Sequence, residues 1–137
     1  MSDETTATAN ERIVRQFYDL FAKGEMAAVA HLFSPEFLFV PAGKRGVLAG
    51  THVGPEQILS FIERQMALTD GTWVPRPYDV LAGERHVAVL VTVTATRDGK
   101  SALFRLVHLW RIEDGIAREL RSYVDDQYAY DQFFSSR

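Results

Sequence analysis

SALFRLVHLWRIEDGIARELRSYVDD, residues 101–126, is the stretch that decides the fold of this chain. Apolar residues alternate along it, which is typical of two β-strands joined by a tight turn at Glu113-Asp114-Gly115. Successive side chains of a strand point to opposite faces of a sheet, so we expect the even positions to face an interior. These even positions are Phe104, Leu106, His108, Trp110, Ile112, Leu120, Ser122 and Val124.

His108 and Ser122 are the polar members of this apolar set. A few polar groups among apolar side chains are how a small-molecule pocket is usually lined, and a structural buried histidine has the same pattern. If the turn places Ile112 opposite Ile116, His108 faces Leu120 and lies diagonal to Ser122, within side-chain reach. A ligand-binding and a structural role for the histidine are both open from this pattern.

Similar patterns precede this hairpin. Extended stretches near 72–81 and 85–97, with glycine-containing turns at 82–84 and 98–100, predict a four-stranded antiparallel meander. Pro75 and Pro77 confine the stretch 72–81 to a sheet edge or a bulge. In the N-terminal half, a capping box at Thr8 and Glu11 predicts a first helix that runs to about residue 23. The pattern then predicts a helix at 25–32, a strand at 37–40, a loop at 41–54 and a helix at 55–68. The aromatic tail after residue 125 predicts a lid or a short helix.

This order predicts the α+β fold class: a curved antiparallel sheet wrapped on three N-terminal helices, with an internal apolar cavity. The length of 137 residues favours one domain, 10–137, after a disordered lead, 1–9. The net charge of −3 gives no basic footprint, so we expect no nucleic-acid partner. No apolar run reaches membrane-spanning length, and the polar N-terminus is unlike a secretory signal, so a cytoplasmic protein is predicted.

Three segments of the chain resemble one known family: ERIVRQFYDLF at 11–21, GTHVGPEQILSFI at 50–62, and VHLWRIEDG with LRSYVDD at 107–126. They resemble the SnoaL-like branch of the nuclear transport factor 2-like superfamily, over residues 11 to about 134. The resemblance implies a cone-shaped fold with a blind apolar pocket, and no metal or organic cofactor. It also implies dimers that pair through the outer faces of their sheets. Members include polyketide cyclases, ketosteroid isomerase, epoxide hydrolases and scytalone dehydratase.

The resemblance also implies a site. Tyr18 matches the tyrosine that cyclase-type members carry on the first helix, His52 lies close to their polar loop position, and His108 matches their strand histidine. Their acid on the last strand falls at Ser122, and Asp126 is the candidate replacement because it keeps the inward parity. Residues that we expect to contact substrate are Phe104, Leu106, Trp110, Leu120, Val124, Phe61 and Phe17. The histidines and carboxylates show no metal-ligand spacing.

Two functions follow as hypotheses. One is a cofactor-independent cyclase, isomerase or lyase that acts on an apolar cyclic or polyketide-like molecule by acid–base chemistry, with neutral His108 as the base and Tyr18, Ser122 or His52 as donors. The other is a non-catalytic small-molecule-binding protein of the same fold, favoured by the serine at the acid position. The apolar ligand and a second copy of the chain, docked on the outer sheet face, are the expected partners.

Overall fold

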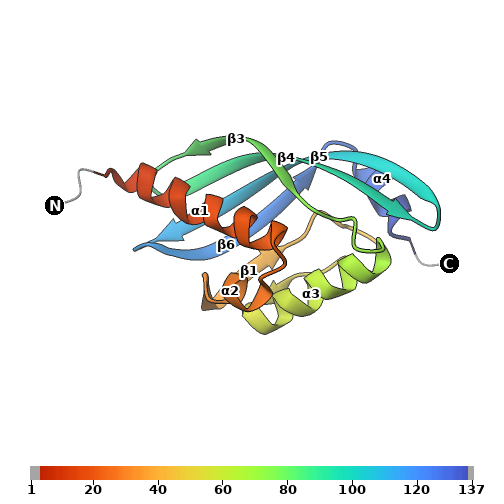
Figure 1. Cartoon of the computed structure of the whole chain (residues 1–137), viewed down its shortest axis with the longest axis horizontal. Coiled ribbons are helices and arrows are strands. Elements are labelled where there is room, and N and C mark those ends of the chain that lie inside the picture. Colours follow the sequence, from red (N-terminus) through yellow and green to blue (C-terminus); the bar gives the residue numbers. More distant parts are fainter. Residues whose placement is uncertain (1–3, 136–137) are drawn as a thin grey trace.

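The computed structural model describes residues 4–135. They form one six-stranded sheet in the order β2-β1-β6-β5-β4-β3, with α1 lying across it and α4 at the end opposite the start of α1 (Figure 1). The helices are α1 (Thr6–Ala22), α2 (Met26–Ala30), α3 (Pro55–Leu68) and α4 (Gln127–Phe133). The strands are β1 (Phe33–Val40), β2 (His52–Val53), β3 (Arg76–Ala82), β4 (His86–Arg97), β5 (Lys100–Glu113) and β6 (Ile116–Val124). The α+β class and the helices before the meander are confirmed.

The inner face of the sheet carries the core. On β4 the side chains of Val87, Val89, Val91 and Val93 are buried and alternate with more exposed positions. On β5 the even positions from Phe104 to Ile112 are buried in the same way, as the alternation predicts. A helix layer covers this face because α1 and α3 each place an apolar stripe against it.

One pairing departs from the predicted antiparallel sheet. β3 to β6 form the expected antiparallel meander, but β1 pairs with β6 in parallel, with Phe39 beside Leu120. A parallel pair requires a long connection between its strands, and here α3 and the meander supply it. The pairing places β1 beside β6, although the two strands lie far apart in the sequence.

The predicted register of the β5–β6 hairpin is wrong because the turn is tighter than expected. Asp114 and Gly115 both have positive φ, 53° and 73°, the conformation of a two-residue type I′ turn. Glu113 therefore pairs with Ile116, whereas we predicted that Ile112 would.

A β-bulge next to this turn adds a second shift, since the register changes between Arg111 and Ile112. Two one-residue shifts together preserve the parity of the side chains beyond the bulge. As a result His108 lies directly opposite Ser122 on the inner face, not diagonal to it, and not opposite Leu120.

The N-terminal lead is shorter than predicted. α1 begins at Thr6, and the side chain of Thr5 caps it by accepting from the backbone N–H of Thr8 at 3.1 Å. Thr8 is therefore inside the helix, and residues 6–9 of the predicted disordered lead are helical because the chain offers an earlier cap. Residues 1–3 of that lead lie outside the described part of the chain.

Other boundaries also move. β1 begins at Phe33 rather than 37, and the predicted loop 41–54 contains β2, which pairs His52 with Phe39. β3 begins at Arg76 and lies at the sheet edge with an irregularity after Pro77, as the prolines predict. The tail forms the short helix α4. Within residues 4–135, none of the helices has the length and hydropathy needed to span a bilayer.

Candidate functional site

A cavity lies between the inner face of the sheet and the helices α1, α3 and α4. Fourteen of its lining residues are apolar, half of them aromatic, and the polar ones are Gln65, His108, Ser122 and Tyr130. No carboxylate or cation from the described residues lines it. The cavity therefore offers hydrogen bonds in an uncharged apolar surrounding, which suits a neutral ligand.

The cavity is narrow as it stands. The space open to the centre of a water-sized sphere is about 50 Å³. A cavity of about 150 Å³ is known to hold one benzene molecule. A ligand with a ring must therefore displace some of the lining side chains when it enters.

A chain of two hydrogen bonds, which runs through Tyr18 of α1, holds the imidazole of His108. The indole Nε1 of Trp110 donates to the hydroxyl of Tyr18 at 3.1 Å, and this hydroxyl lies 2.8 Å from Nδ1 of His108. The Tyr18 and His108 rings are nearly parallel, with centroids 5.9 Å apart. Their burial beneath α1 fixes the imidazole in one orientation.

This chain of hydrogen bonds assigns the tautomer of His108. An indole N–H only donates, so the Tyr18 oxygen accepts from Trp110 and its own proton goes to Nδ1 of His108. The opposite arrangement would leave the buried Tyr18 proton without an acceptor among residues 4–135, at a cost of about 1–3 kcal/mol. Neutral His108 therefore carries its proton on Nε2, which has no protein partner in the described chain, and His108 lines the cavity.

Burial keeps both groups uncharged. Desolvation lowers the pKa of His108 from 6.5 to about 4. Desolvation also raises the pKa of Tyr18 well above its usual range, more than the Trp110 hydrogen bond lowers it. At neutral pH the imidazole is thus a neutral N–H donor aimed at the cavity, and its low basicity makes it a poor proton acceptor.

Ser122 lies beside this donor. It is directly opposite His108 across the β5–β6 pair, and it is half-buried in the cavity lining. Its hydroxyl bonds to no other side chain or backbone group in the described part of the protein, so it can donate to a ligand or accept from one. The two residues place two hydrogen-bonding groups at one point of the sheet.

The remaining residues of the predicted catalytic set lie elsewhere. His52 is on β2, in a separate surface groove with Glu56, Ser60 and Arg64, and burial lowers its pKa. Its Nε2 is enclosed without a hydrogen-bond partner from residues 4–135. Asp126 is exposed and caps α4 by accepting from a backbone N–H of that helix at 2.9 Å. Neither residue lines the cavity of His108.

The family assignment rests on most of the chain. Residues 14–120 match the SnoaL-like domain family. The chain belongs to the SnoaL-like family. An uncharacterized protein of Mycobacterium tuberculosis, Rv0034, is 29% identical over 95% of this SnoaL-like chain and 99% of its own length.

Solved structures agree with this assignment. Bal32a, from a soil-derived mobile gene cassette, is 27% identical and superposes with a TM-score of 0.88 over 95% of this SnoaL-like chain and 99% of its own. A nuclear transport factor 2-like protein from Burkholderia pseudomallei is 22% identical, with a TM-score of 0.83 over 93% and 98% of the two chains. The nuclear transport factor 2-like fold is therefore shared.

The SnoaL-like cavity uses only part of the predicted substrate-binding set. Phe17, Phe61, Leu106 and Leu120 line it. Phe104, Trp110 and Val124 do not. Trp110 lies behind the cavity wall, where it donates to Tyr18, and Phe104 packs edge-to-face on Tyr130. Tyr18 is likewise absent from the lining and acts through His108.

The predicted site omits the two other polar residues of the lining, Gln65 and Tyr130. A signal for Gln65 exists, since it lies four positions after Phe61 and seven after Ile58 on the apolar stripe of α3. A polar residue at a helical core position is the unusual observation that points to a site. Tyr130 gave no comparable signal because the tail around it is rich in aromatic residues.

Proposed function

We propose that this SnoaL-like protein binds a neutral, largely apolar small molecule whose carbonyl oxygen accepts a hydrogen bond from Nε2 of His108. One observation carries the proposal: the Trp110–Tyr18–His108 chain fixes the imidazole with its N–H toward the cavity. A donor in a cavity wall that has no protein partner pairs with water or with a ligand, and a ligand acceptor can take the place of the water. Ser122 supplies a second group to the same oxygen.

The uncharged lining selects a neutral ligand. A carboxylate or ammonium group brought into this surrounding would lose its hydration and find no counter-charge in the lining described by residues 4–135. A carbonyl on an apolar ring loses little hydration by comparison and gains the His108 hydrogen bond. The proposed ligand is accordingly an apolar cyclic ketone or a related carbonyl compound.

A second candidate is cofactor-free turnover of such a ligand by acid–base chemistry, as in a cyclase, isomerase or lyase. The observation that favours it is the oriented neutral imidazole, since a fixed N–H donor stabilises negative charge as it develops on an enolate oxygen. No lining side chain of the described residues, however, is a base with a pKa near 7. Binding is therefore the function that the geometry supports best.

We also propose that the protein forms a homodimer through the outer face of its sheet. On that face Leu103 and Tyr123 are each about half exposed, at 53% and 52%, next to the half-buried Val107 and Leu109. A second copy would cover these apolar side chains. Sedimentation of the wild type and of Tyr123→Glu tests the proposal, and a monomeric wild type would refute it.

The binding proposal is tested with two ligands of similar size. Acetophenone carries the carbonyl, and isopropylbenzene replaces the carbonyl with an apolar group. Dissociation constants from NMR titration should favour acetophenone by roughly five- to tenfold in the wild type, the value of one buried hydrogen bond. His108→Phe should abolish this preference, whereas His86→Phe, a change at the exposed start of β4, should retain it.

The same samples separate binding from turnover. Transfer to D₂O with acetophenone allows exchange of the methyl protons next to the carbonyl to be followed by NMR. Exchange accelerated by the wild type and not by His108→Phe would favour the acid–base candidate. Equal binding of the two ligands by the wild type would refute the proposed role of His108.

A further inference from the structure

We infer that the cavity contains a second polar subsite, formed by Gln65 and Tyr130, which recognises a hydroxyl group of the ligand. The ligand class is then a ring compound that carries a carbonyl at one position and a hydroxyl at another, with apolar carbon between them. This inference rests on the proposed function, because it assumes that His108 binds the carbonyl. It adds the group that decides which carbonyl compounds fit.

Both residues are deeply buried. The side chains of Gln65 and Tyr130 belong to residues that are only 6% and 2% exposed, and both line the cavity. Nε2 of Gln65 donates to the Tyr130 hydroxyl at 3.5 Å, the long end of the range for a hydrogen bond. Burial raises the pKa of Tyr130 well above its usual range, so this hydroxyl keeps its proton.

The pair still has unused hydrogen-bonding capacity. Oε1 of Gln65 has no hydrogen-bond partner among residues 4–135, and it is not one of the atoms that protein encloses completely. The proton of the Tyr130 hydroxyl likewise has no protein acceptor in this part of the chain. Buried polar groups are almost always satisfied, so water or a ligand group within the cavity pairs with these two atoms.

The unused groups are an acceptor and a donor side by side. Oε1 of Gln65 accepts, and the hydroxyl of Tyr130 donates. A ligand hydroxyl does both and therefore satisfies both groups at once, whereas a carbonyl oxygen can only accept. The two subsites thus differ in chemistry, because Oε1 of Gln65 only accepts, whereas at the carbonyl subsite Nε2 of His108 donates and the Ser122 hydroxyl can donate as well.

The two subsites are also separated along β5. Tyr130 packs on Phe104, with ring centroids 5.5 Å apart, whereas the carbonyl subsite is at His108. Phe104, Leu106 and His108 follow one another on the inner face, and four residues of a strand span about 13 Å. Leu106 lines the cavity between them, so the middle of the ligand meets an apolar wall.

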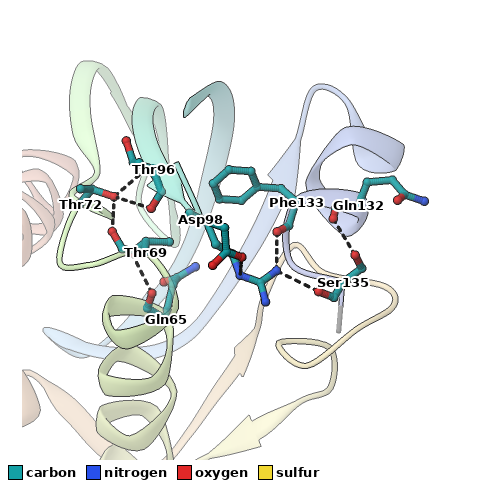
Figure 2. A network of polar contacts seen from close by, with 9 residues as sticks. Gln65, Thr69, Thr72, Thr96, Asp98, Gln132, Phe133 and Ser135 are labelled. Atoms are coloured by element: carbon teal, nitrogen blue, oxygen red, sulfur yellow. Dashed lines mark hydrogen bonds and ion pairs between the residues drawn. The ribbon is translucent and has the colours of Figure 1, made fainter. Parts of the chain in front are cut away.

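Hydrogen bonds from the end of β4 fix the position of α3, the helix that carries Gln65. Figure 2 shows the hydrogen bonds that connect them: Thr69 donates to the backbone carbonyl of Gln65 at 2.8 Å, and Thr72 donates to the carbonyl of Thr69 at 2.5 Å. The backbone N–H of Thr96 in turn donates to the Thr72 hydroxyl at 2.9 Å. The last turn of α3 is thereby fixed to the sheet.

Arg97, the residue of β4 that follows Thr96, fixes the position of α4, the helix that carries Tyr130. The guanidinium of Arg97 donates to the backbone carbonyls of Phe133 and Ser135, at 2.7 and 2.9 Å, where α4 ends (Figure 2). Two adjacent positions of one strand therefore position both helices of the subsite. A site whose groups are held in this way is suited to discriminate between ligands.

The test uses two probes that differ only in the second group. The probes are 4-hydroxyacetophenone and 4-methylacetophenone, whose hydroxyl and methyl groups have similar size. The wild type should bind the hydroxyl compound roughly five- to tenfold more tightly in NMR titration. Gln65→Met and Tyr130→Phe, which keep side-chain size, should bring this ratio close to one while retaining the preference for acetophenone over isopropylbenzene.

The control is Tyr128→Phe, which removes a hydroxyl from a residue of α4 that is 75% exposed. It should keep the wild-type ratio. Because each ratio compares two ligands of one variant, a general loss of stability does not alter it. A hydroxyl preference that is absent from the wild type, or that survives in both cavity variants, would overturn the second subsite. If the carbonyl preference is missing from the wild type as well, the proposed function itself fails, and the inference fails with it.

Discussion

Acidification should destabilise the wild-type protein through His108 alone by about 2.5 kcal/mol between pH 7 and pH 4.5. Burial lowers the pKa of this imidazole from 6.5 to about 4 in the folded chain. Unfolding exposes the ring, which then takes up a proton as the pH falls through 6.5, while the folded form stays neutral down to about pH 4. The stability contributed by neutral His108 is therefore complete above pH 6.5 and is lost as the pH falls toward 4.

The size of the effect comes from this difference in pKa. Each pH unit within the window changes the free energy of unfolding by about 1.36 kcal/mol per proton. Two units of the window lie above pH 4.5, and partial protonation of the unfolded ring at pH 7 and of the folded ring at pH 4.5 reduces their sum slightly, to about 2.5 kcal/mol. The fully buried position of His108 means that solvent screens little of it.

The assay is urea denaturation of the wild type and of His108→Phe at both pH values, followed by tryptophan fluorescence. All other titrating groups are shared, so the difference in pH dependence between the two proteins isolates His108. We expect the variant to start less stable, because Tyr18 loses its acceptor, and to lose about 2.5 kcal/mol less on acidification. Parallel pH profiles would refute the view that His108 is desolvated and neutral.

Three further changes test parts of the fold that hold the cavity. Asp126→Ala should lower the free energy of unfolding by about 1 kcal/mol through loss of the α4 cap, and should leave the acetophenone preference intact. Arg97→Ala should cost about 1.5–3 kcal/mol and speed amide hydrogen exchange in α4, because the charge-assisted hydrogen bonds to the carbonyls of Phe133, the last residue of α4, and Ser135 disappear. Gly115→Ala, at φ 73°, should lower stability by about 1 kcal/mol in thermal unfolding. A stable Gly115→Ala protein would contradict the type I′ turn.

The sequence was sufficient for features that depend on local pattern. Alternation along 101–126 predicted which side chains face the interior, and His108 and Ser122 do lie together in the cavity lining. The exact register of β5 and β6 could not be predicted from this alternation. A tight turn and a bulge together shift the pairing by two residues and leave the alternation beyond the bulge unchanged. The parallel pairing of β1 with β6 was also missed, since no local signal marks a contact between distant segments.

The chemistry of the site depended on contacts that the sequence does not encode locally. Tyr18 was predicted as a group of the pocket, but it lies behind His108 and sets the proton on that ring. Trp110 was predicted to contact substrate, and instead it donates to Tyr18. The hydrogen bond from Tyr18 and the burial of His108 therefore favour a donor role over the predicted role as base.

The parallel pair of β1 and β6 also has a kinetic consequence. β3 to β6 connect through short turns, so their contacts form between residues close in the chain, whereas Phe39 meets Leu120 about eighty positions later. Closing so long a loop costs chain entropy before the contact repays it, which makes such pairings slow. Phe39 and Leu120 both line the cavity. We therefore expect the cavity to be completed late in folding and opened early in unfolding, so that an occupant would lengthen the lifetime of the native protein.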